Sequence, residues 1–155
     1  MITADRFDRW LLSFDYLKEH AFDQADLDFD SGYGDSRVLR DPDTGEDTPF
    51  TGLTYISYDD ITLDGYTFYV NGVRQGQYVR FHRPGGALKT FGHQMNNSPD
   101  GTWYEFYETG ALKRIDFYAR GRCFACRAYD EDGVITGEVA DTDADLIRRL
   151  DALTA

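Results

Sequence analysis

The sequence predicts a mainly β protein of the α+β class: an antiparallel meander of β-hairpins flanked by an N-terminal helix and a short C-terminal helix. Three observations lead to this fold. A segment of similar sequence recurs at a fixed period, aromatic-rich runs alternate with glycine turns, and apolar residues at helical spacing occupy both ends of the chain. At 155 residues, the chain has the length of a single domain and is long enough to bury a core.

The recurring segment appears three times between residues 71 and 135, as NGVRQGQYVRFHRPGGAL, NNSPDGTWYEFYETGAL and ARGRCFACRAYDEDGVI. Each copy has a glycine or asparagine turn, an aromatic-rich run and a second turn that closes on Gly86, Gly110 or Gly133. These closing glycines lie 24 and 23 residues apart, and a fainter copy occupies residues 51–63. A fixed period of this length is typical of stacked supersecondary units.

The strands are predicted from aromatic and β-branched residues between tight turns, a composition that suits a pleated, half-buried surface. They cover residues 53–58, 67–70, 78–82, 87–95, 103–107, 111–118 and 123–129. Short strands joined by tight turns form an antiparallel meander. We therefore expect one repeat β-sheet over residues 48–137.

Helices are predicted over residues 1–20 and 142–154. In the first, Phe7, Trp10, Leu11, Phe14 and Leu17 make one apolar stripe, with Thr3 as the N-cap. This helix either packs on the sheet or binds a partner. In the second, the capping-box pattern at residues 142–145 precedes apolar residues at helical spacing. We expect it to cover the last hairpin, because a repeat array needs its open end capped.

Acidic residues gather in the flanks of the chain, which has a net charge of −12. Residues 1–70 carry −11 and residues 129–155 carry −6, whereas the repeats at residues 71–128 carry +5. Such flanks can serve solubility and attract the sheet of the same chain. They can equally form an acidic surface that meets a basic partner, since complementary charge speeds association.

Residues 21–47 are predicted to form an acidic connecting segment with a strand over residues 37–39 and a turn over residues 41–45. The turn resembles the start of a calcium loop. However, Gly45 offers no side-chain oxygen, and Gly52 stands where the closing glutamate would be. An aspartate-rich turn is the simpler interpretation.

The sequence shows no apolar run of membrane-spanning length and no basic-then-apolar leader, so we expect a cytoplasmic protein with no membrane span. Cys123 and Cys126 form no disulfide framework. Their spacing is half of a zinc site without a second half, and in a strand such positions are expected to face opposite sides. We expect no metal and no cofactor, and the sequence assigns these cysteines no role.

Enzymatic motifs are also missing from the sequence. His20, His82 and His93 lie at no metal-ligand spacing, and no nucleophile elbow, P-loop or dinucleotide fingerprint is present. The many carboxylates fall in turns and flanks, so they indicate no acid–base pair. We therefore expect a protein that is not an enzyme.

Alternation along the strands separates two faces of the sheet. Val79, Phe81, Tyr104 and Phe106 share the more apolar face, which we assign to the core. The other face is expected to carry Tyr78, Arg80, His82, Trp103, Glu105 and Tyr107. An exposed face with this composition is typical of a binding hot spot, unless a flanking helix covers it.

The frame carried by Asn71, Gly72, Gly76, Tyr78, Phe81, Gly86 and Leu88 recurs at Gly101, Trp103, Phe106, Tyr107, Gly110 and Leu112. This frame resembles the MORN repeat variant found in bacterial antitoxin and immunity proteins. Residues 48–52 are similar to the segment that precedes the first repeat in that family, and the resemblance spans roughly residues 48–137. It departs from the pattern at Asn97 and at Phe124, where glycines would stand.

The resemblance implies a small non-enzymatic protein that binds and neutralises a bacterial protein toxin, in particular a toxin's C-terminal domain. The contacts are expected either from the acidic flank at Asp26, Asp28 and Asp30 or from the aromatic face. Three other functions remain open: a MORN-type interaction or membrane-surface scaffold, RNA binding by the basic, aromatic sheet, and an enzyme. The acidic flanks argue against nucleic acid and against an anionic membrane.

Overall fold

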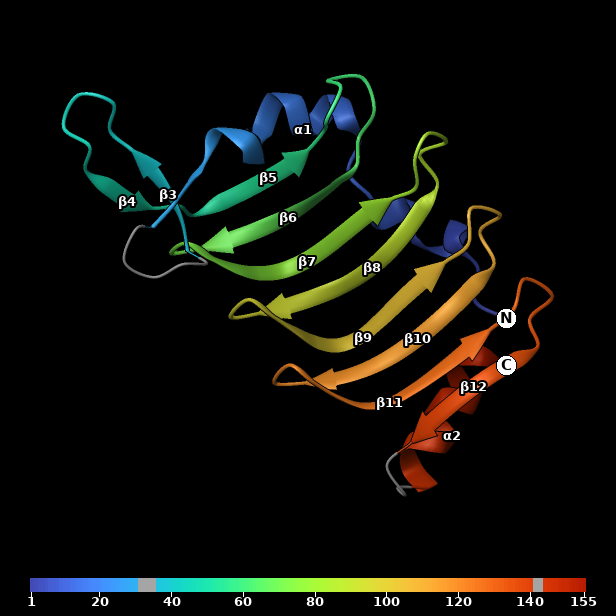
Figure 1. Ribbon diagram of the computed structural model, residues 1–155. Coiled ribbons are helices and arrows are strands. Elements are labelled where there is room, and N and C mark those ends of the chain that lie inside the picture. The colour runs from blue at the N-terminus through green and yellow to red at the C-terminus, as the bar shows by residue number, and fades with distance from the viewer. Residues whose placement is uncertain (31–35, 141–143) are drawn as a thin grey trace.

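The computed structural model describes residues 1–30, 36–140 and 144–155. Its main feature is a nine-stranded sheet in which each hairpin lies beside the next along the chain (Figure 1). The order of the strands is β1-β5-β6-β7-β8-β9-β10-β11-β12, and all neighbours are antiparallel except β1, which runs parallel to β5. The predicted mainly β meander is confirmed.

The nine strands include the seven strands predicted for the repeat sheet, four of which are longer than predicted, together with β1 and β12, which the sequence does not predict. They are β1 (Phe22–Asp23), β5 (Gly52–Ile56), β6 (Gly65–Val70), β7 (Val73–Phe81), β8 (Leu88–Met95), β9 (Ser98–Phe106), β10 (Leu112–Ala119), β11 (Arg122–Tyr129) and β12 (Ile135–Ala140).

Two-residue turns join the strands at one end of the sheet. Both residues of each turn have positive φ, between 49° and 83°: Asn71 and Gly72, Asn96 and Asn97, Arg120 and Gly121. This is the geometry of type I′ turns, whose twist matches that of the strands they join. Asn97 can replace the glycine of the repeat because asparagine enters this region more readily than most residues.

Longer loops join the strands at the opposite end, and the last three of them close on a glycine with positive φ: Gly86, Gly110 or Gly133. The same backbone hydrogen bond closes each loop, with N–O distances of 2.7 to 2.9 Å, from His82 to Ala87, from Tyr107 to Ala111 and from Asp130 to Val134. The repeat in the sequence is therefore a repeat in the backbone.

The helical N-terminus is confirmed, but it consists of two pieces: the 3₁₀ helix η1 (Ala4–Trp10) and α1 (Phe14–His20). At the break, the Leu12 amide donates to the Tyr66 hydroxyl at 3.1 Å, and Ser13 Oγ caps α1 by accepting from the Tyr16 amide at 3.1 Å. The predicted stripe is split as a result, since Phe7 and Leu17 are buried but Trp10 is 48% exposed.

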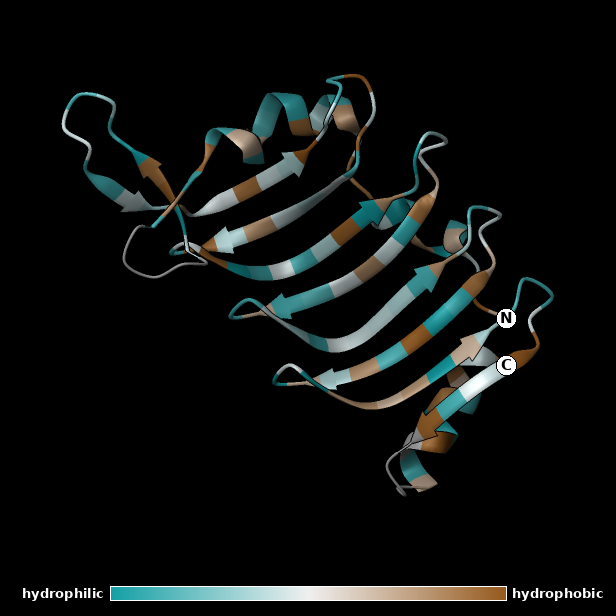
Figure 2. Ribbon diagram, in the orientation of Figure 1, coloured by the Kyte–Doolittle hydropathy of each residue, from teal (hydrophilic) through white to brown (hydrophobic). Residues whose placement is uncertain are grey.

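The two pieces of the N-terminal helix and the C-terminal helix pack on the same face of the sheet (Figure 1). Phe7, Leu17 and Leu150, the last from α2 (Ala144–Thr154), join strand residues such as Val79 and Phe106 in one core. Figure 2 shows the alternation of hydrophilic and hydrophobic residues along β10 that leaves one face for this core. The predicted capping box at residues 142–145 lies largely outside the described residues.

The acidic segment forms a small structure of its own. A short 3₁₀ helix, η2 (Gln24–Asp26), leads into a three-stranded sheet of β2 (Asp28–Phe29), β3 (Arg37–Arg40) and β4 (Asp47–Pro49). The predicted strand and turn are present here. Asp41 Oδ1 accepts hydrogen bonds from the amides of Asp43 and Thr44 at 2.8 and 3.0 Å, so this carboxylate is engaged within its own turn.

Membrane-spanning helices are not found among the described residues, where no helix combines the necessary length and apolar character.

Candidate functional site

The candidate site lies on the open face, which we define as the face of the main sheet opposite η1, α1 and α2. Val79 and Phe106 are fully buried on the helix-covered face, and strand alternation therefore places Tyr78, Arg80 and Glu105 on the open face. The predicted division into two faces is confirmed. The alternative, that a flanking helix covers the aromatic face, is wrong for the helices described.

An aromatic ladder, formed by Tyr78, Trp103 and Tyr118, crosses the open face. The Tyr78 and Trp103 ring centroids are 5.0 Å apart, and those of Trp103 and Tyr118 are 6.1 Å apart. Gly92 of β8 makes room for the ladder, because a Cβ there would lie 2.4 Å from the Trp103 ring. Trp103 Nε1 donates to the His93 carbonyl at 2.9 Å, so the indole is held at two points.

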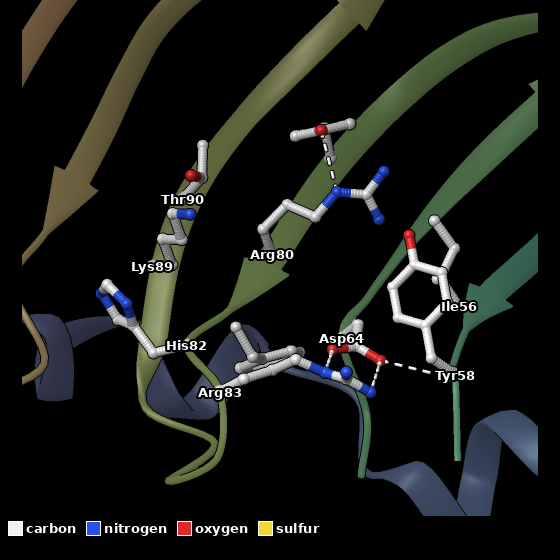
Figure 3. A pocket seen from close by; sticks show the side chains of 10 residues that line it. Ile56, Tyr58, Asp64, Arg80, His82, Arg83, Lys89 and Thr90 are labelled. Atoms are coloured by element: carbon white, nitrogen blue, oxygen red, sulfur yellow. Dashed lines mark hydrogen bonds and ion pairs between the residues drawn. The ribbon is translucent and has the colours of Figure 1, made fainter. Parts of the chain in front are cut away.

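The cationic hollow is a cavity of ≈ 590 Å³ at one end of the ladder, and its charged residues are Asp64, Arg80, Arg83 and Lys89 (Figure 3). Arg83 is engaged with Asp64 through two nitrogens, one of them Nη2 at 3.0 Å from Oδ2. The Tyr58 amide donates to the same carboxylate at 3.2 Å, and the Arg83 guanidinium lies 4.9 Å from the Tyr58 ring centre. Asp64 is thus fully occupied by its own chain.

Arg80 is held in the hollow by its neighbours. Its Nε donates to the Tyr78 hydroxyl at 2.9 Å, and its guanidinium carbon lies 4.8 Å from the Tyr78 ring centre. It crosses Gly65, where a Cβ would come within 2.5 Å of Arg80 Nη1. That nitrogen is buried and has no hydrogen-bond partner in the described part of the chain. No ion pair with an acid is formed by Arg80 or Lys89 within residues 1–30, 36–140 and 144–155.

The aromatic hollow, of ≈ 250 Å³, adjoins the cationic hollow through Tyr78 and Thr90, which line both. Its acidic members are Glu105 and Asp116. Burial raises the pKa of Asp116 above its ordinary value, and the hydrogen bond from Arg114 Nε, at 2.7 Å, only partly opposes this. The two hollows together make a trough that is cationic near β7 and β8 and acidic near β9 and β10.

The predicted site residues divide into two groups. The structure brings Tyr78, Arg80, Trp103 and Glu105 together in the trough. Tyr107 does not line either hollow, and its hydroxyl donates to the Tyr129 carbonyl at 2.9 Å.

The acidic trio also lies elsewhere. Asp26 ends η2, Asp28 begins β2, and Asp30 follows β2, so all three belong to the small acidic structure. Asp28 Oδ1 lies 3.7 Å from Arg40 Nη1, which partly compensates its charge. None of the three lines the trough.

Four features of the trough are not predicted from the sequence: Tyr118, Asp116, Lys89 and the ion pair of Asp64 with Arg83. Alternation along residues 112–119 already carried the signal for Tyr118 and Asp116, since Ile115 and Phe117 are the buried positions between and beside them. No sequence signal pairs Asp64 with Arg83, because the two residues come from loops on different hairpins.

Cys123 and Cys126 lie on the same face of the sheet, contrary to the prediction from their spacing. Cys126 lies opposite Asp116 and Cys123 opposite Tyr118, because a β-bulge inserts Phe124 between the paired positions. Both cysteines therefore belong to the open face, and the expectation of opposite faces is wrong. Burial and the nearby Asp116 raise the pKa of the Cys123 thiol. Among the described residues, no cluster of three or more His, Cys, Asp or Glu suits a metal.

Comparison with known proteins adds little. No protein-family model matches the sequence, and no curated protein matches it. A solved structure of the GtfA/B complex bound to UDP and GlcNAc contains a chain that is 14% identical, with a TM-score of 0.23 over 79% of this chain and 23% of its own length. This chain thus spans less than a quarter of that protein, and the likeness carries no argument about fold or function.

Proposed function

We propose that the chain is a non-enzymatic immunity protein or antitoxin, which binds the C-terminal domain of a bacterial protein toxin through its open face. One observation carries the proposal: the aromatic ladder stands on the sheet face that η1, α1 and α2 leave uncovered. Trp, Tyr and Arg dominate the hot spots of protein interfaces. The resemblance of the hairpins to MORN variants of immunity proteins supports the same function.

The ladder suits binding because its rings are already positioned. Gly92 and the His93 carbonyl hold Trp103 in place, so little side-chain freedom remains to be lost when a partner docks. Truncating a central hot-spot residue typically costs about 2 kcal/mol or more, a factor of roughly 30 in Kd. We propose that binding takes place in the cytoplasm, where Cys123 and Cys126 would remain reduced.

Co-expression tests the proposal. A toxin domain encoded beside the gene for this chain should arrest growth of a bacterial host, and the wild-type chain should restore growth. Trp103→Ala should fold and fail to protect, whereas Trp10→Ala, which removes the other tryptophan from the helix-covered side, should protect like the wild type. Equal protection by both variants would show that the open face is not the contact surface. Circular dichroism checks that both variants are folded.

A further inference from the structure

We infer that the cationic hollow binds a side-chain carboxylate of the protein partner, so that the partner docks an acidic segment along the trough. This inference rests on the proposed function and deepens it, because it states the chemistry that the partner must present at the end of the aromatic ladder.

The charge of the hollow is the first argument. The whole chain carries −12, yet the three cations Arg80, Arg83 and Lys89 line this cavity with one acid, Asp64, and the only other acid paired with them among the described residues is Asp59, 3.9 Å from Arg83. The hollow therefore holds a local excess of one positive charge within a negative protein. A concave site concentrates such a field, and an acidic group of the right partner gains most from it.

The positions of the side chains are the second argument. Arg83 already binds Asp64, so Arg80 and Lys89 remain to meet an incoming group (Figure 3). Tyr78 orients the Arg80 guanidinium through Nε, and Nη1 is buried over Gly65, which leaves Nη2 for a carboxylate. Among the described residues, no acid pairs with this guanidinium. A carboxylate at Nη2 and Lys89 would supply the missing negative charge.

The acidic end of the trough is the third argument. Glu105 and Asp116 line the aromatic hollow, and Arg114 compensates only Asp116, so this end keeps a negative charge and an acidic side chain is directed to Arg80 and Lys89. The shared wall at Tyr78 and Thr90 lets one segment enter both hollows. The partner segment therefore carries an acidic residue beside an apolar or aromatic one, with the ring resting on the ladder.

Peptide titration of the full chain, followed by NMR, tests this inference. The probes are acetyl-Glu-Phe-Glu-amide, acetyl-Gln-Phe-Gln-amide and inorganic phosphate. The acidic peptide should shift the Arg80 Nε–H and Trp103 indole resonances saturably, and the glutamine peptide should bind at least tenfold more weakly. The R80Q/K89Q variant should lose at least tenfold in affinity. The matched R9Q/K18Q variant removes the same two residue types from the helix-covered side and should bind as the wild type does.

Three results would overturn the inference: equal affinity for the two peptides, no effect of R80Q/K89Q, or saturable binding of phosphate without binding of the acidic peptide, which would indicate a site for a free small anion. The co-expression assay keeps the two proposals apart. If the wild type protects cells and R80Q/K89Q protects equally, the carboxylate site is refuted while the toxin-binding function stands. If the wild type does not protect, the toxin-binding function is refuted, and the inference that rests on it falls too.

Discussion

His82 and Tyr107 occupy equivalent positions in successive repeats, and each side chain forms a hydrogen bond to a backbone carbonyl of the next hairpin. His82 Nε2 lies 2.8 Å from the Phe106 carbonyl oxygen, and the Tyr107 hydroxyl donates to the Tyr129 carbonyl at 2.9 Å. A carbonyl oxygen only accepts, so Nε2 of His82 carries the proton. Each bond ties the loop end of one hairpin to the next hairpin. Tyr107, which the sequence suggests as a contact residue, therefore has a structural role.

Arg120 is the residue least suited to its backbone conformation. It has a φ of 52° at the first position of a type I′ turn, where the other two such turns have asparagine. A side chain other than Gly, Asn or Asp costs about 1 kcal/mol in this region. Arg120→Asn should raise the free energy of unfolding by about that amount in urea denaturation. The reverse change in the equivalent turn, Asn96→Arg, should lower it, and a gain from both would contradict the explanation.

Asp116 should give a pH-dependent stability difference. Its pKa in the folded state lies above the ordinary value of 3.8 because burial disfavours the charged form. The penalty is fully present above the folded pKa and disappears as the pH falls to 3.8. Asp116→Asn should therefore raise the melting temperature at pH 7, and the gain should shrink as the pH approaches 4. A gain that is independent of pH would point to packing as its cause.

Asp59 provides the control of opposite sign. Hydrogen bonds from the Thr62 and Ile61 amides lower its pKa to about 2. Its ionised form therefore stabilises the fold above its unfolded pKa, and this contribution is lost as the pH falls through about 2. Asp59→Asn should lower the melting temperature at pH 7, and the loss should fade in acid.

At the scale of the strand, the aromatic ladder requires a residue without a side chain at position 92 of β8, and Gly92 meets this requirement. Gly92→Ala should displace Trp103, because a Cβ there would lie 2.4 Å from the indole. We expect a changed tryptophan signal in near-ultraviolet circular dichroism and weaker binding of the proposed toxin partner. Gly137→Ala on β12 is the matched control, since a Cβ at that position meets nothing within 4 Å. An unchanged near-ultraviolet spectrum for Gly92→Ala would contradict the placement of the ring.

The features that could be predicted from the sequence are those that depend on local patterns. The period of the hairpins and the alternation of faces are local patterns, so both could be predicted. The break between η1 and α1 could not, because the Tyr66 hydroxyl that receives the Leu12 amide lies 54 residues away. The cationic hollow was missed for the same reason: Asp64 and Arg83 meet only after two hairpins pair. The common face of the cysteines depends on a bulge that a regular strand pattern does not reveal.

At the scale of the molecule, the sheet is an array that is covered at its last hairpin by α2. Arg127 of β11 connects the two, since it is buried and its guanidinium reaches Glu138 of β12 as well as Asp151 and Thr154 of α2. Leu150 of α2 is fully buried beside it. In a repeat array each unit is stabilised mainly by its neighbours. Loss of the Arg127 contacts should therefore destabilise the strands at this edge before the rest of the sheet.

Arg127→Leu should therefore loosen one end of the molecule and leave the site intact. Removing the cation breaks charged hydrogen bonds to groups that remain partly exposed, which should cost about 2 kcal/mol. Hydrogen exchange should speed up in β11, β12 and α2 while β7 and β8 keep their protection. Binding of the proposed toxin partner should change little, because most of the trough lies on earlier strands. Arg148→Leu, at an exposed position on the same helix, should leave exchange unchanged. Uniform acceleration over all strands in Arg127→Leu would show instead that the sheet unfolds as one unit and that α2 supports the binding face as well.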